Sequence, residues 1–347
     1  MSEANGPRPT LEAVAARAGV SRATVSRVVN GGAGVRGTVQ EKVRRAVAEL
    51  GYVPNSAARA LVTRRTGAVA VVIAEPETRV FSDPFFGRQL RGISRELSAA
   101  DTQLLLLFVA HRDDYDRIGR YLAAGHVDGA LMFSLHRDDP LPAMAAGAGL
   151  PTVYGGRPGW PGAEREPRPL YVDTDNRDGA RQAVRHLVER GRRRIAVITG
   201  PLDQTSALDR LHGYRDALAP AGPDPRLIAD GAFTAHGGER AMARLLDAVP
   251  DLDAVFASSD LMANGALRTL RARGRRVPDD VAVVGYDDLE PAAWADPPLT
   301  TVRQDVEEMG RLMARLLLRR LGTQGAGGPA LRPVITGAEL VIRESSG

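Results

Sequence analysis

The sequence contains no cysteine, which excludes disulfide bonds, thiol chemistry and zinc sites that need cysteine ligands. No apolar run reaches the roughly 18 residues that a membrane-spanning helix needs. The first six residues carry neither the basic nor the apolar region of a secretory signal peptide. These absences favour a cytoplasmic protein.

Motifs typical of several enzyme classes are also missing. The chain has no phosphate-binding glycine loop, no G-x-S-x-G elbow and no histidines at metal-binding spacing. Its six histidines are scattered, and we expect them at the surface. We therefore expect no catalytic residue, no metal and no cofactor.

Lysine is nearly absent, because Lys42 is the only lysine among 46 basic residues. Residues 1–65 carry eleven basic and four acidic residues, whereas the rest of the chain carries 35 basic and 38 acidic residues. A basic head on a near-neutral body is typical of a protein whose N-terminal part binds nucleic acid. A chain of 347 residues is long enough for two or three domains.

Two short helices joined by a glycine are predicted near the N-terminus. The first covers residues 11–18 after Thr10 as its N-cap, Gly19 makes the turn, and the second begins at Ser21. The second helix buries valines at i, i+3 and i+4 spacing and leaves arginine and hydroxyl side chains outside. This is the helix-turn-helix layout, in which the second helix enters the major groove of DNA.

A third helix and a linker are predicted next. The third helix starts with a capping box at Thr38 and ends before Gly51. Residues 56–63 favour a helix of about two turns, which is too short to be stable alone. We therefore expect a helix-turn-helix domain over residues 1–53, a hinge helix and linker over 54–66, and a body over 67–347.

In the body, strand-like apolar runs alternate with amphipathic helical segments. One series runs from a strand at 68–73 to a strand at 150–154, and a second starts after residue 175 and ends with a strand at 334–342. Two such series predict two doubly wound parallel-sheet lobes. We expect an N-lobe over about 67–172 plus 303–325 and a C-lobe over about 173–302 plus 326–343. A ligand should bind between them, at the carboxyl ends of the strands.

These motifs together resemble the LacI/GalR family of bacterial transcriptional repressors along nearly the whole chain. The resemblance is carried by Thr10–Asn30, Glu49–Leu61, Gly285–Asp288 and Pro297–Val302. It implies a small all-α helix-turn-helix head and a periplasmic-binding-protein-like α/β body of two doubly wound parallel-sheet lobes. It also implies a homodimer that binds an inverted-repeat DNA operator and is released by a small sugar or oligosaccharide. Residues 74–86 are similar to those of regulators that respond to cello-oligosaccharides.

The resemblance assigns the DNA contacts residue by residue. Arg22 and Ala23 match positions that read bases, and an arginine fork favours guanine. Ala58 and Leu61 match a hinge helix whose leucine wedges into the minor groove. The set expected at DNA is Thr10, Ser21, Arg22, Ala23, Thr24, Ser26, Arg27, Asn30, Tyr52, Asn55, Ala58 and Leu61.

The resemblance also places effector residues in the cleft. A carboxylate and a guanidinium, as at Asp287 and Arg210, suit vicinal sugar hydroxyls, although a structural ion pair is the alternative. Some relatives carry a carboxylate where this chain has Gly156, so we expect room for a larger ligand. The set expected at the effector is Phe85, Phe86, Asp175, Ser206, Arg210, Ser259, Asp287 and Trp294. The alternative for each aromatic residue is a place in the core.

Two other functions stay open at this point. An α/β enzyme would use groups such as Asp260, Asp287 and His212 for acid–base chemistry. A secreted sugar-binding protein would need a signal peptide and would not need a basic head. Binding to inverted-repeat DNA would favour the repressor, whereas turnover of a sugar would favour the enzyme.

Overall fold

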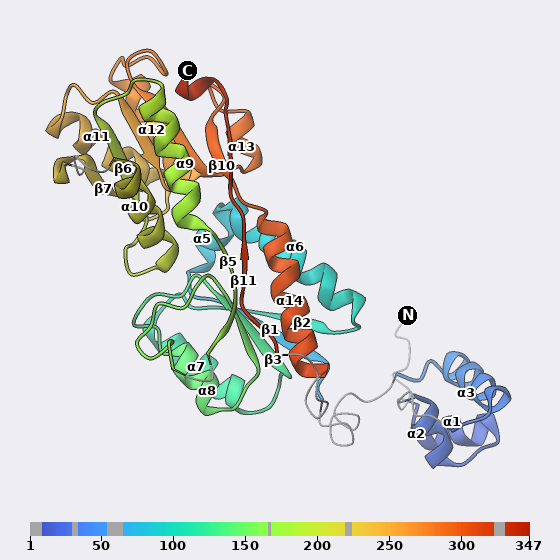
Figure 1. The fold of residues 1–347 in the computed structure, drawn as a ribbon. Coiled ribbons are helices and arrows are strands. Elements are labelled where there is room, and N and C mark those ends of the chain that lie inside the picture. The colour runs from blue at the N-terminus through green and yellow to red at the C-terminus, as the bar shows by residue number, and fades with distance from the viewer. Residues whose placement is uncertain (1–8, 30–33, 54–64, 166–167, 219–223, 323–329) are drawn as a thin grey trace, which may run out of the picture. The chain divides into compact units, whose positions relative to one another are not determined.

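The computed structural model describes residues 9–29, 34–53, 65–165, 168–218, 224–322 and 330–347. The chain forms two compact units, a small one that ends at Gly67 and a large one from Ala68 to Gly347 (Figure 1). Among the described residues, no helix is long and apolar enough to span a bilayer.

The small unit contains the helices α1 (Leu11–Ala18), α2 (Arg22–Val29) and α3 (Gly37–Leu50). Thr10 Oγ1 accepts a hydrogen bond from the Ala13 amide at 3.3 Å, and Ser21 Oγ accepts one from the Thr24 amide at 3.2 Å. These bonds confirm both predicted N-caps. The three helices share one core, made of Val14, Ala15, Val25, Val43, Ala46 and Tyr52.

The capping box predicted at Thr38 is wrong. Helix α3 begins at Gly37, and its N-cap residue Arg36 makes no side-chain capping bond. Gln40 instead donates from Nε2 to the carbonyl oxygen of Val35 at 2.9 Å, which ties the helix start to the preceding loop. The end of the helix is as expected, since Gly51 adopts a left-handed φ of 62°.

The N-lobe contains a parallel sheet with strand order β11-β5-β4-β3-β1-β2. Side chains alternate along β1, so that Val69, Val71 and Ile73 pack under α6 and α14, whereas Ala70 and Val72 pack under α7 and α8. The strands are β1 (Ala68–Ile73), β2 (Gln103–Phe108), β3 (Gly129–Phe133), β4 (Thr152–Gly155), β5 (Leu170–Thr174) and β11 (Val334–Thr336). The helices are α5 (Glu77–Ser82), α6 (Pro84–Ala99), α7 (Arg112–Ala123), α8 (Leu141–Gly147) and α14 (Val306–Gly322).

The C-lobe contains a second sheet, with strand order β12-β10-β9-β8-β6-β7, in which only the β12–β10 pair is antiparallel. Helices α11 and α12 cover one face, and α9 and α10 cover the other. The strands are β6 (Ile195–Thr199), β7 (Ile228–Asp230), β8 (Ala254–Ala257), β9 (Ala282–Asp287), β10 (Thr300–Arg303) and β12 (Glu339–Val341). The helices are α9 (Asn176–Glu189), α10 (Thr205–Leu218), α11 (Ala235–Ala248), α12 (Asp260–Ala272) and α13 (Glu290–Ala293), with short 3-10 turns at Pro225–Leu227 and Glu344–Ser346.

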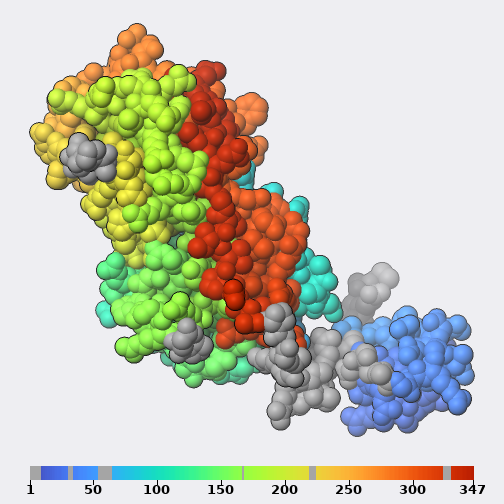
Figure 2. All heavy atoms as spheres, in the orientation of Figure 1, coloured from blue at the N-terminus to red at the C-terminus, as the bar shows by residue number. Residues whose placement is uncertain are grey.

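The described chain crosses between the lobes between β5 and α9, between β10 and α14, and between β11 and β12. The single strand expected at 334–342 is therefore wrong, because β11 pairs with β5 of the N-lobe and β12 with β10 of the C-lobe. Residues 334–336 thus belong to the N-lobe sheet rather than to the expected C-lobe. Figure 2 shows this C-terminal part of the chain, in red, running along both lobes.

Candidate functional site

Helix α2 and its N-cap residue Ser21 carry six of the twelve residues expected at DNA. Thr10, Ser21, Arg22, Ala23 and Arg27 are exposed, and Thr24 and Ser26 are half-buried. Arg22 Nε lies 3.0 Å from Glu12 Oε1 of α1. Both side chains of this ion pair are mostly exposed, so a guanine or phosphate can replace Glu12 at little cost.

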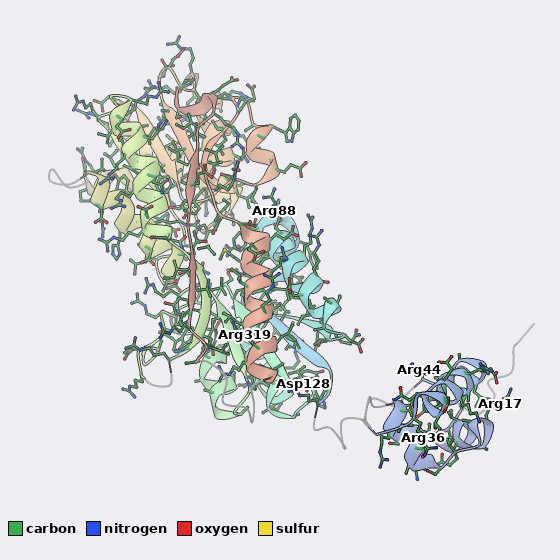
Figure 3. The ribbon with its side chains drawn as sticks, turned by 45° about the vertical axis from the view of Figure 1, so that its right-hand side comes forward. Arg17, Arg36, Arg44, Arg88, Asp128 and Arg319 are labelled. Atoms are coloured by element: carbon green, nitrogen blue, oxygen red, sulfur yellow. The ribbon has the colours of Figure 1, made fainter. Side chains whose placement is uncertain are left out.

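Arginines also project from other parts of the small unit. Figure 3 labels Arg17 of α1, Arg36 just before α3 and Arg44 of α3 at different sides of this unit. Arg17 Nη2 is held 2.5 Å from Glu49 Oε2. The basic charge of the head is therefore not confined to α2. It suits attraction to the phosphate backbone over a wider surface.

Tyr52, which is also expected at DNA, does not share the exposed surface of α2. The side chain is 8 % exposed and packs in the core of the small unit with Val14, Val25 and Val43. The left-handed Gly51 turns the chain back over the helices and carries the ring inward. Asn30, Asn55, Ala58 and Leu61 lie outside the described residues.

A cavity lies between the two lobes of the large unit, where strands of both sheets end. It contains about 960 Å³ of empty space, the solvent at its mouth included. The strand ends supply Phe133 of β3, Gly155 of β4, Asp173 of β5 and Asp287 of β9. This confirms that the cavity lies at the carboxyl ends of parallel strands.

Arg210 of α10 is the central cation of the cavity wall and is 5 % exposed. Its Nε donates to Asn176 Oδ1 at 2.8 Å, and its Nη1 donates to the carbonyl oxygen of Ser258 at 2.6 Å. The guanidinium carbon lies 3.6 Å from the centroid of the Tyr286 ring. Arg210 Nη1 is also 3.7 Å from Asp287 Oδ1, so a fixed cation stands beside a buried carboxylate.

Asp287 reaches the cavity through an unusual backbone conformation. Asp287 has a φ of 112° and Asp288 a φ of 49°, a region that non-glycine residues rarely adopt. Gln304 Nε2 donates to Asp287 Oδ1 at 2.5 Å, and Arg343 Nη2 donates to Asp288 Oδ1 at 2.6 Å. Burial raises the pKa of Asp287 to about 7, against the lowering effect of Arg210. Such a strained, desolvated acceptor is typical of a binding site.

Asp173, at the end of β5, is a second buried acceptor in the cavity wall. It accepts hydrogen bonds from the amides of Arg157 at 3.0 Å and Thr174 at 2.8 Å, and from Asn176 Nδ2 at 3.0 Å. Burial nevertheless raises the pKa of Asp173 to about 6. Asn176 bonds both Asp173 and Arg210, so these three side chains form one polar network.

A further polar cluster joins the lobes at the cavity. Ser134 Oγ of the N-lobe donates to Glu75 Oε1 at 2.7 Å, and Gln204 Nε2 of the C-lobe lies 3.3 Å from the same oxygen. His136 Nδ1 lies 2.8 Å from Asp203 Oδ2, again across the lobes. His136 also forms part of the cavity wall.

The expectation of surface histidines is wrong for His186. Its side chain lies on α9, is 7 % exposed, and has Nε2 2.8 Å from Ser346 Oγ. The C-terminal residues cover this helix, and burial lowers the pKa of His186.

Aromatic rings form the apolar part of the cavity wall. Phe85 and Phe86 begin α6, Phe133 ends β3, Phe233 follows β7, and Trp160 lies in the loop after β4. The Phe86 and Phe133 rings stack with centroids 6.2 Å apart. Aromatic walls beside polar groups suit a ligand that has both apolar faces and hydroxyl edges.

The structure brings six of the eight expected effector residues to this cavity, namely Phe85, Phe86, Ser206, Arg210, Ser259 and Asp287. Asp175 does not line it. Asp175 lies beyond the end of β5, is exposed, and caps α9 by accepting from the Asp178 amide at 3.0 Å. Trp294 does not line it either, because it follows the short α13 and is 80 % exposed.

Sequence reasoning missed several residues that the cavity contains. The principal ones are Asp173, Trp160, His136, Phe233 and Gln304, whereas Asn176 was expected in the cleft and lies there. Asp173 stands at the carboxyl end of β5, the place where a ligand is expected, but the predicted strands do not include β5. No sequence signal marks Trp160 either, because its loop has no regular pattern.

The cavity does not group acid–base residues as the enzyme alternative requires. Asp260 is buried outside the cavity wall, where it accepts from Thr301 Oγ1 at 2.6 Å and from the Leu289 amide at 2.8 Å. His212 is not in the wall either. Among the described residues, no group of three or more histidine, aspartate or glutamate side chains could hold a metal ion.

Comparison with known proteins links both parts of the chain to one family. Residues 10–55 match the model of the bacterial regulatory proteins of the lacI family, and residues 184–346 match a periplasmic binding protein-like domain. The chain is 52 % identical over 343 residues to the HTH-type transcriptional regulator CelR of Thermobifida fusca, with 97 % of this chain and 98 % of CelR covered. It is 31 % identical, over the same shares, to the repressor PurR of Haemophilus influenzae.

Solved structures agree with these matches. A complex of the transcriptional regulator CelR with cellobiose is similar to the chain with a TM-score of 0.76 and 50 % identity, over 97 % of this chain and all of the other. The Lac repressor dimer, bound to operator and an anti-inducer, gives a TM-score of 0.82 and 28 % identity, over 98 % and 99 %. The chain therefore belongs to the lacI family of bacterial regulatory proteins and is a DNA-binding transcriptional repressor rather than an enzyme.

Proposed function

We propose that a homodimer of this chain binds an inverted-repeat operator through α2 and is released when cellobiose or a short cello-oligosaccharide enters the inter-lobe cavity. The observation that carries this proposal is the buried pair of Arg210 and Asp287 beside aromatic walls. A donor and an acceptor side by side suit vicinal hydroxyls, and the rings suit the apolar face of a pyranose. The cellobiose complex of a protein 50 % identical to this chain supports the choice of sugar.

At the operator, we assign base reading to Arg22 and positioning on phosphates to the hydroxyls of α2 and to Arg27. An arginine fork matches the O6 and N7 acceptors of guanine in the major groove. Asn30, Asn55, Ala58 and Leu61 complete the proposed contacts, with Leu61 as the minor-groove wedge. Because the operator is chromosomal DNA, we place this activity in the cytoplasm.

The edge of the N-lobe sheet supports the homodimer. Strand β2 is an edge strand, and its residues from Leu104 to Phe108 are apolar and only half-buried. Phe81 of α5 is 74 % exposed, and its ring centroid lies 5.6 Å from that of Phe108. An apolar edge of this kind is a hazard for a monomer unless another chain covers it. Two-fold pairing would also match an inverted-repeat operator.

The layout of the cavity explains how sugar and DNA would influence one another. The cavity wall belongs to both lobes, so a bound sugar changes the preferred angle between them. If that angle sets the spacing of the two heads in the dimer, sugar and operator must weaken one another's binding by the same factor.

The proposal is tested by selecting operators from random duplex DNA with the full-length chain and then adding sugar. We expect the selected sequences to be inverted repeats and cellobiose to release them, with maltose and glucose much less effective at equal concentration. A selected pool without two-fold symmetry would contradict the dimeric operator. Cellobiose that leaves DNA binding unchanged, or tightens it, would contradict release by this sugar.

A further inference from the structure

The loop between β4 and β5 contains Trp160. The proposed DNA contacts and the Arg210–Asp287 pair do not use this residue. We infer that Trp160 is the platform for the second sugar ring of a disaccharide and that its loop makes the cavity select disaccharides over monosaccharides. The inference rests on the proposed sugar-binding function. Trp160 lines the cavity, is half-buried, and packs on the buried Tyr154 with ring centroids 4.7 Å apart. The indole thus packs against Tyr154 and also forms part of the cavity wall, where a ligand can contact it.

The loop that carries Trp160 also leaves open space at Gly156. Gly156 also lines the cavity, and a Cβ atom added to it would have no neighbour within 4 Å. Its φ of 95° disfavours any larger residue at this position. The cavity wall at Gly156 therefore carries no side chain that would exclude a second ring.

The loop is held across the cavity by contacts with the other lobe. Thr205 Oγ1 of the C-lobe donates to the carbonyl oxygen of Arg157 at 2.6 Å. Arg157 Nη2 donates to both carboxylate oxygens of Asp209, at 2.7 and 2.6 Å. A Cβ atom on Gly159 would lie 2.5 Å from Thr205 Cγ2, so only glycine permits this approach. Trp160 is therefore carried by a loop with a fixed position.

Hydrogen bonds connect this loop to the polar end of the cavity. Asp173 accepts from the Arg157 amide and from Asn176 Nδ2, and Asn176 accepts from Arg210. The hydroxyl-binding end at Arg210 and the platform at Trp160 are thus parts of one framework. In the inferred arrangement a monosaccharide occupies only one of these ends. A β-linked disaccharide presents hydroxyls to one end and a flat apolar ring face to the other, so binding energy at Trp160 favours the disaccharide.

The composition of the chain allows a direct test, because Trp160 and Trp294 are its only tryptophans. Trp294 is 80 % exposed and outside the cavity, which makes it a matched control. In full-length Trp294→Phe, where Trp160 is the sole emitter, cellobiose should change the fluorescence intensity or wavelength. In Trp160→Phe the same titration should leave the fluorescence unchanged.

Calorimetry supplies the affinities. Trp160→Ala should weaken cellobiose binding at least about tenfold and glucose binding less than about twofold, whereas Trp294→Ala should leave both within about twofold. The inference would be overturned if Trp160→Ala lost affinity equally for the two sugars or kept its affinity for cellobiose. It would also be overturned if a Trp294→Phe chain bound cellobiose without any change in Trp160 fluorescence. If the unmodified chain binds no cellobiose, the proposed sugar is wrong and this inference fails with it.

Discussion

Arg157 and Asp209 join the two lobes through a bidentate ion pair, with Arg157 Nη2 2.7 and 2.6 Å from the two carboxylate oxygens. Arg157 belongs to the loop after β4 of the N-lobe, and Asp209 belongs to α10 of the C-lobe. The next residue on α10 is Arg210, which faces the cavity. Asp209, which holds the lobes together, and Arg210, which is placed to bind the sugar, are therefore neighbours on α10.

Asp209→Asn should weaken cellobiose binding, because it removes the charge that favours the closed arrangement of the lobes. A partly exposed ion pair contributes up to about 1 kcal/mol, which corresponds to about fivefold in the dissociation constant measured by calorimetry. Asp216→Asn is the control, since Asp216 pairs with Arg177 of α9 at 2.6 Å within the C-lobe. Equal effects of the two substitutions would show that the bridge between the lobes has no special role.

Asp287→Asn should abolish release by the sugar while operator binding persists. Above pH 7, where Asp287 is ionised, the substitution replaces a buried charged acceptor with a neutral amide. Hydrogen bonds to charged groups contribute about 1.5–3 kcal/mol, or roughly 10- to 150-fold in sugar affinity. A gel shift on operator DNA with increasing cellobiose measures both properties. Asp175→Asn, at the expected residue that lies outside the cavity, should respond like the unmodified chain. Release of Asp287→Asn at the usual sugar concentration would contradict the assignment.

The stability of the large unit should depend on pH through Asp173. Burial raises its pKa to about 6 in the folded chain, above the ordinary 3.8, so the folded state holds this proton more tightly than the unfolded state. The stabilisation is fully present below about pH 3.8 and is lost as the pH rises to about 6. This loss lowers the free energy of unfolding by at most about 3 kcal/mol between pH 3.8 and 6. In Asp173→Asn the loss should be absent when the free energy of unfolding is measured in urea across that range. Parallel pH profiles for the two chains would contradict the prediction.

Arg22→Ala should weaken operator binding by about 1–3 kcal/mol and relax the preference for one guanine in each half-site. Fluorescence anisotropy with operator and with single-base variants measures both effects. Arg44→Ala, an exposed arginine of α3, should lower affinity for all sequences by the same factor. Glu12→Gln should change operator affinity less than about threefold, since its exposed pair with Arg22 contributes little. An Arg22→Ala chain that keeps the guanine preference would exclude this arginine as the base reader.

Phe81→Asp should weaken the dimer at least about tenfold, because it places a charge on the apolar edge formed with β2. Sedimentation velocity over a range of concentrations gives the dissociation constant. Ile342→Asp changes another exposed apolar residue, which is 56 % exposed, and should leave the dimer intact. A Phe81→Asp chain with the dissociation constant of the unmodified protein would exclude this surface.

Local patterns were sufficient for much of the fold. Thr10 and Ser21 cap the helices expected of them, because a cap depends on residues three positions apart. Two α/β lobes follow from the alternation of strands and helices. The strand expected at 334–342 failed for a different reason: its two halves pair with different sheets, and pairing partners far along the chain decide that.

The site was less predictable than the fold. Asp173 and Asp175 are two positions apart, yet only Asp173 enters the cavity, because β5 ends between them. Trp160 and Trp294 are equivalent as residue types, and only the path of the loop after β4 brings Trp160 to the wall. Which residue of such a pair lines the cavity depends on the positions of both lobes, and the sequence alone does not give these.

By itself, the sequence determined the family, the basic helix-turn-helix head and the two-lobed body, since these depend on periodicity, charge and short motifs. The resemblance to the family then implied that Arg210 and Asp287 lie in the cleft, where the structure has them. Tertiary structure alone decided that Tyr52 is a core residue, that His136 faces a cavity, and that Arg157 meets Asp209. Those relationships join residues from separate elements. They arise only when sheets, helices and loops pack together, because packing sets which side chains lose contact with water and which remain at the cavity wall.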